Sequence, residues 1–193
     1  MANIISASYF GKGTCYVPNI TTATGSQSDL SNFNDFLALN ETEYLKGFFG
    51  YELATIITNA YNAFIDNNTP LPDRIADIIN GKEFTDVYGN LQKWEGLKRS
   101  NLVSPIANYV YYYWRKDKVS DPTITGEIVN DPESSIDIGP GQKMVTAWNY
   151  GVEQNKILYE FLYVNSSVYP EFNRYTTNKS RISLLVPINI FGF

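Results

Sequence analysis

Apolar and polar positions follow a helical period through most of the middle of the chain, most clearly in residues 97–118. Ser104 followed by Pro105 is typical of an N-cap and a first helical position, because proline lacks the amide that would be unsatisfied there. The basic end of the stretch, residues 115–118, suits a helix C-terminus. One face of this helix would carry Leu102, Ile106, Tyr109, Val110 and Tyr113.

The other faces of this helix are also aromatic, since they carry Tyr111, Tyr112 and Trp114. A helix that is apolar or aromatic all round must be buried. It is therefore either a central core helix or a core helix whose outer aromatic residues are covered by a partner chain, because tyrosine and tryptophan are favoured in interfaces. Under the second interpretation these three residues are candidate interface residues.

Three more helices are predicted. The first begins at Asn40, where Asn40 and Glu43 resemble a capping box, and is interrupted at Gly50 before an amphipathic run that ends at residues 66–68. A short helix over residues 72–80 follows and is ended by Gly81.

The last predicted helix runs from about residue 140 to residue 165. Its apolar stripe is interrupted by Asn155, and Gly151 would allow close approach of a neighbouring helix. The stripe consists of Met144, Trp148, Val152, Leu158 and Leu162.

Two segments between the helices lack a helical period. Residues 82–96 place short apolar-polar runs around Gly89-Asn90, which predicts a β-hairpin. Residues 119–141 are predicted to be a long irregular loop, within which residues 123–129 could extend as a strand. The acidic residues of this loop lack the DxDxDG spacing of a calcium loop, so no metal site is expected.

The two ends of the chain also lack helical periodicity. Residues 1–39 are interpreted as an N-terminal arm and residues 171–193 as an extended C-terminal arm, which flank a helical-bundle domain over residues 40–170. The final apolar segment is β-prone, so it either adds a strand to a neighbouring chain or packs as a final strand on its own domain. Its candidate interface residues are Arg181, Ile182, Leu184, Leu185, Val186, Ile188, Ile190, Phe191 and Phe193. The expected fold class is mainly α, a small helical bundle with a short hairpin.

Composition bears on function mainly through absences. The chain has no histidine, which excludes Ser-His-Asp and Cys-His catalysis and every histidine-containing zinc site. Its single cysteine, Cys15, excludes an internal disulfide. The net charge of −5 argues against nucleic acid as the main partner. These features favour a non-enzymatic interaction or structural protein without a cofactor, with a carbohydrate-binding module as an alternative because exposed Tyr and Trp can stack on sugar rings.

Motifs in residues 40–155 resemble those of a family of small structural proteins in tailed phages of Bacteroidota hosts. That family has a K-W-x-G-L segment before a helix ending in aromatic residues, then a T-x-x-G-E/V loop and a helix containing K-M/V-x-x-A-W-N. The matching residues here are Lys93, Trp94, Gly96, Leu97, Tyr112, Tyr113, Trp114, Thr125, Gly126, Glu127, Lys143, Met144, Ala147, Trp148 and Asn149.

The resemblance implies a head–tail connector, also called an adaptor or head-completion protein. Such proteins are similar to a small helical bundle, often with about twelve copies in a ring. The implied partners are other copies of the chain, the portal protein, and a tail or second neck-ring protein, with genomic DNA only as passing cargo and no membrane. The implied location is the neck of a virion, after synthesis in the host cytoplasm. A tail-completion or minor capsid protein would have a similar sequence.

Overall fold

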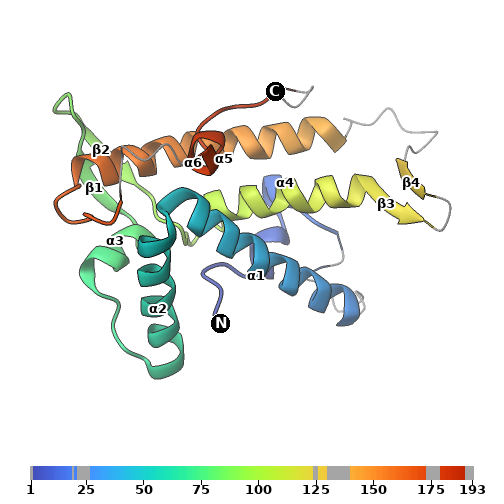
Figure 1. The fold of residues 1–193 in the computed structure, drawn as a ribbon, viewed down its shortest axis with the longest axis horizontal. Helices are drawn as coiled ribbons and strands as arrows, with labels where there is room; N and C mark the ends of the chain where they lie inside the picture. The colour runs from blue at the N-terminus through green and yellow to red at the C-terminus, as the bar shows by residue number, and fades with distance from the viewer. Residues whose placement is uncertain are drawn as a thin grey trace.

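The computed structural model describes residues 2–18, 20, 27–123, 126–129, 140–172 and 179–189. The described chain is mainly helical, as predicted, and contains two pairs of antiparallel strands. Figure 1 shows two helices, over residues 105–119 and 140–164, lying side by side along the longest axis, with the helices of residues 27–80 on one side of them.

These two helices are α4 (Pro105–Val119) and α5 (Pro140–Val164). Helix α4 begins where Ser104 and Pro105 predicted it, and the Ser104 hydroxyl accepts a hydrogen bond from the Ile106 amide at 3.2 Å. The close approach predicted at Gly151 is confirmed, because a Cβ atom there would lie 3.1 Å from Cβ of Asn108. A larger residue at this position of α5 would push the two helices apart.

Helix α1 (Gln27–Phe49) begins well before Asn40, so the predicted capping box is wrong. Asn40 lies inside the helix, where its side-chain amide donates to the Phe36 carbonyl at 2.9 Å. Phe33 and Leu37 are fully buried and continue the apolar face upstream. The first half of α1 was missed in the sequence because the exposed residues around Phe33 and Leu37 are mostly polar and include Asn32 and Asn34.

The break at Gly50 and the two helices after it are confirmed. Gly50 has a φ of 83°, in the region that favours glycine, and separates α1 from α2 (Tyr51–Asn67). The predicted short helix is α3 (Asp73–Asn80), and it ends at Gly81.

Residues 2–18 and 20 pack into the core and do not form the expected arm. They contain two short 3₁₀ helices, η1 (Ala7–Phe10) and η2 (Gly13–Cys15). Ile4 and Ile5 are 3% and 1% exposed, and their amides donate to the two carboxylate oxygens of Glu41 at 2.8 and 3.1 Å. A carboxylate inside α1 therefore holds the start of the chain, a contact that no local pattern signals.

The predicted hairpin is confirmed as β1 (Lys82–Thr85) paired with β2 (Leu91–Trp94). One carboxylate oxygen of Asp86 accepts from the amides of Tyr88 and Asn90 at 2.9 and 2.8 Å, which closes the turn. At the other end of the hairpin, the Trp94 indole donates to the Ile78 carbonyl at 2.8 Å. The hairpin is thus fastened to α3 at its base and projects away from the bundle (Figure 1).

The irregular loop expected over residues 119–141 contains a second pair of strands. β3 (Ser120–Thr123) and β4 (Gly126–Val129) are antiparallel, with Thr123 opposite Gly126. Within the possible strand over residues 123–129, Thr123 ends β3 and residues 126–129 form β4, while residues 124–125 lie outside the described residues. Residues 130–139 lie outside the described residues.

The contact between Glu41 and the start of the chain predicts a specific pH dependence. Burial raises the pKa of the Glu41 carboxyl to about 7, against an ordinary value of 4.5, and the two amides lower the pKa only in part. Because the folded state then holds a proton that the unfolded state has lost, the free energy of unfolding should fall as pH rises between these two values. The expected fall is about 3 kcal/mol.

Urea unfolding at a series of pH values, on the wild type and on Glu41→Gln, measures this effect. The variant should lose the fall with pH, because its amide does not titrate. The variant should also be less stable than the wild type at acidic pH. Its side-chain NH₂ group cannot accept a hydrogen bond, so one of the amides of Ile4 and Ile5 loses its acceptor. Parallel pH curves for the two proteins would contradict the assignment to Glu41.

Candidate interaction surfaces

The aromatic residues of α4 that were predicted as interface candidates pack in or against the chain's own core. Tyr111 is 2% exposed. The Trp114 ring packs edge-on against Phe33 and Phe36, with centroid separations of 4.9 and 5.1 Å. Tyr112 lies 4.7 Å from the ring of Trp148. These contacts fit the interpretation of a central core helix, and a partner interface at these residues stays a prediction.

The start of the C-terminal segment is helical where a strand was predicted, since α6 spans Lys179–Ser183. Arg181 is 5% exposed, its Nε donates to the Phe48 carbonyl at 2.6 Å, and its guanidinium lies 4.3 Å from the Phe172 ring centroid. Burial lowers the pKa of Arg181. Leu184 is 4% exposed, and the helical turn places it on the same side as Arg181, against α1. A strand would not bring these two side chains to one face at this spacing.

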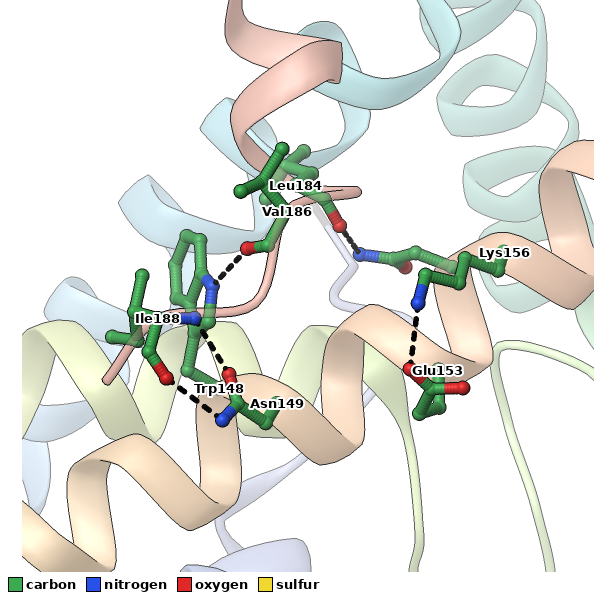
Figure 2. Close-up of polar contacts among 8 residues, drawn as sticks. Trp148, Asn149, Glu153, Lys156, Leu184, Val186 and Ile188 are labelled. Carbon is green, nitrogen blue, oxygen red and sulfur yellow. Dashed lines mark hydrogen bonds and ion pairs between the residues drawn. The ribbon is translucent and has the colours of Figure 1, made fainter. Parts of the chain in front are cut away.

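Residues 184–188 are held along α5 through their main chain (Figure 2). The Trp148 indole donates to the Val186 carbonyl at 3.0 Å, and Asn155 donates to the Leu184 carbonyl at 2.9 Å. Asn149 bonds both main-chain groups of Ile188, accepting from its amide at 2.8 Å and donating to its carbonyl at 2.9 Å. We call this set of contacts the C-terminal clasp.

The clasp supports the alternative in which the final segment packs on its own domain. Of the predicted interface residues in this segment, Arg181 and Leu184 are buried, while Ile182 and Val186 are 47% and 49% exposed. Leu185 and Ile188 are half-buried and pack against the core. Ile190, Phe191 and Phe193 lie outside the described residues.

The hairpin carries exposed apolar residues that the sequence analysis did not single out. Val87, Tyr88 and Leu91 are 56%, 85% and 72% exposed, and we call these three residues the hairpin tip. Because turns are normally polar, the apolar pair Val87-Tyr88 directly before Gly89-Asn90 is the sequence feature from which this exposed apolar surface could have been predicted. Three large exposed apolar side chains on a projecting turn are a candidate interaction surface.

An open cavity of about 520 Å³ lies between η2, the second half of α4 and the first turns of α5. We call it the α4–α5 cavity. Its walls include the rings of Tyr16 and Tyr111 and the cationic side chains of Arg115 and Lys143. Within the described part of the chain, the buried Nε of Arg115 has no hydrogen-bond partner. The cavity therefore offers aromatic surface and positive charge.

Two side chains that could act as nucleophiles, Cys15 and Ser104, instead form hydrogen bonds that stabilise the fold. Burial raises the pKa of the Cys15 thiol to about 12, and the thiol donates to the Asn108 side-chain oxygen at 3.2 Å. The Ser104 hydroxyl is used as the N-cap of α4. No three metal-binding side chains of histidine, cysteine, aspartate or glutamate gather anywhere in the described ranges. No helix among the described residues combines the length and hydropathy that a membrane span needs.

This chain matches no protein-family model, no curated protein sequence and no solved structure. The surfaces described above and the motifs in the sequence are therefore the basis of the functional proposal.

The clasp predicts that Asn149 stabilises the C-terminal segment. Asn149→Ala should lower the free energy of unfolding by about 1–3 kcal/mol, because it removes two hydrogen bonds to Ile188. It should also make the bonds after residue 179 more accessible to a protease.

Glu153→Ala is the matched control, because Glu153 lies on the same helix and forms only an exposed ion pair with Lys156 at 2.8 Å (Figure 2). Its effect should stay within about 0.5 kcal/mol. Equal effects of the two substitutions, measured by urea unfolding and limited proteolysis, would contradict the role given to Asn149.

Proposed function

We propose that this protein is a non-enzymatic structural protein of a tailed-phage virion. In this proposal it is a head–tail connector, which forms a ring between the portal and the tail and surrounds the DNA channel. The sequence motifs that resemble the connector family are the starting point, and the positions of their residues in the fold support the proposal.

The first motif, residues 93–97, ends the hairpin and packs it against the C-terminal end of α3. Trp94 is fully buried, and the Leu97 amide donates to the Ile78 carbonyl at 3.2 Å. Gly96 has a φ of 92°, and a Cβ atom there would lie 2.6 Å from main-chain atoms of Ile79 and Asn80. Only glycine satisfies both conditions, so this motif residue is required by the close packing of two chain segments.

The last motif forms the clasp. Trp148 and Asn149 hold Val186 and Ile188, as Figure 2 shows, and Ala147 is fully buried. Residues of both motifs thus position the hairpin and the C-terminal segment. This observation carries the proposal, because a connector family is defined by surfaces and the packing that places them, and has no catalytic residues to match.

The charge of the chain fits a channel that DNA passes through. The net charge is −5, so phosphate groups would be repelled on average. Repulsion lets DNA slide, whereas a basic lining would bind it. The ring itself, with about twelve copies, follows from the resemblance, and the portal and a tail or second neck-ring protein would bind its two faces.

Quantitative mass spectrometry of gradient-purified virions tests the proposal. The expected result is a ratio near one copy of this protein per portal subunit, with the major capsid protein as an internal reference. A large excess over the portal would instead indicate capsid decoration or a tail tube. Complete absence from virions would contradict a virion role and favour the carbohydrate-binding alternative.

A further inference from the structure

The hairpin tip and the α4–α5 cavity lie at opposite ends of the molecule. Helix α5 connects them, because Lys143 near its start lines the cavity and Phe161 near its end packs on Phe84 of the hairpin at 5.5 Å. These two residues are 18 positions apart, which corresponds to about 27 Å of helix. Figure 1 shows the hairpin at one end of the longest axis and the start of α5 at the other. The tip of a chain cannot reach its own cavity.

The two features are complementary in shape and chemistry. The tip presents a tyrosine that is 85% exposed, flanked by two branched aliphatic residues. A cavity of about 520 Å³ with two tyrosine rings in its wall is large enough to take an aromatic side chain and an aliphatic neighbour. The cationic guanidinium of Arg115 in the cavity wall suits contact with the ring of an entering tyrosine.

The charges of the two features are opposite. Both lysines of the hairpin already have ion-pair partners, since Lys82 bonds Asp77 at 2.6 Å and Lys93 bonds Glu95 at 3.2 Å. Outside these pairs the hairpin carries the exposed carboxylate of Glu83 and the carboxylate of Asp86, which is buried in the turn and accepts hydrogen bonds from Tyr88, Asn90 and Gln92. In the cavity, neither cation forms an ion pair with any described residue. The uncompensated charge of the hairpin is thus negative and that of the cavity wall is positive, so the two surfaces are electrostatically complementary.

We propose that the hairpin tip of one copy occupies the α4–α5 cavity of the next copy. Tyr88 is the central anchor, Val87 and Leu91 close the apolar contact around it, and Arg115 and Lys143 face the hairpin carboxylates. Such a contact joins two different surfaces of the same chain, so it repeats from copy to copy and closes into a ring when the rotation allows. It specifies the subunit contact of the proposed connector ring and rests on that proposal for its place in the virion.

A mixing experiment separates this contact from any other. One variant, Tyr88→Ser with Leu91→Ser, removes the tip, and both residues are exposed, so the fold should be retained. A second variant, Lys143→Glu with Thr146→Trp, fills the cavity and cancels its net positive charge by substitutions at two exposed positions. The control, Leu39→Ser with Tyr51→Ser, removes equally exposed apolar residues that lie elsewhere on α1 and α2.

Native mass spectrometry and sedimentation velocity on the full chain measure the outcome. The wild type and the control should form higher oligomers, whereas each of the other two variants alone should be monomeric, with association weakened about 30-fold or more. An equimolar mixture of the two variants should give heterodimers and nothing larger, because one intact tip and one intact cavity remain per pair.

Three results would overturn the proposal: a wild type that stays monomeric at every concentration, variants that assemble like the wild type, or a mixture that stays monomeric. The connector role is tested separately by virion composition. A protein present at one copy per portal subunit that shows any of these three results keeps the connector role and loses this contact. A protein that is absent from virions but forms heterodimers in the mixture keeps the contact and loses the connector role.

Discussion

The close packing of α4 on α5 is the constraint on which the rest of the structure depends. Gly151 brings α5 within contact distance of Asn108, and Asn108 is 2% exposed. The Asn108 side chain donates to the Ser104 carbonyl at 3.1 Å and accepts from the Cys15 thiol at 3.2 Å. One buried amide therefore joins the start of α4 to the N-terminal segment, and it can do so only because the opposing helix lacks a side chain there.

Both ends of the chain are held on this helix pair and on α1 by polar contacts inside apolar surroundings. Glu41 binds the first residues, and Arg181 and the clasp bind the last described ones. Asn155 links α1 to the C-terminal segment, because its side chain accepts from the Tyr44 hydroxyl at 2.6 Å and donates to the Leu184 carbonyl. Residues 2–18 and 179–189 thus belong to the core, whereas the hairpin tip, the α4–α5 cavity and the side chains of Ile182 and Val186 are open to solvent.

The elements that could be predicted from the sequence are those whose signals are local. Ser104-Pro105, Gly50 and the Gly89-Asn90 turn each determine the backbone within a few residues. The contacts of Glu41 with Ile4 and of Arg181 with Phe48 join residues that are 37 and 133 positions apart, so no periodicity reveals them. The α4–α5 cavity is likewise formed by three separate segments. The sequence shows the tyrosines and cations that line the cavity, but it does not show that these three segments come together in the fold.

Native-state hydrogen exchange tests most directly whether both chain ends belong to the core held by α4 and α5. The amides of Ile4, Ile5 and Ile188, which donate to buried or half-buried side chains, should exchange far more slowly than in an unfolded peptide. The slowest exchange should be in the facing parts of α4 and α5. Exchange across residues 2–17 and 184–188 at the rate of a free peptide would show that the ends are arms after all, and would contradict this account.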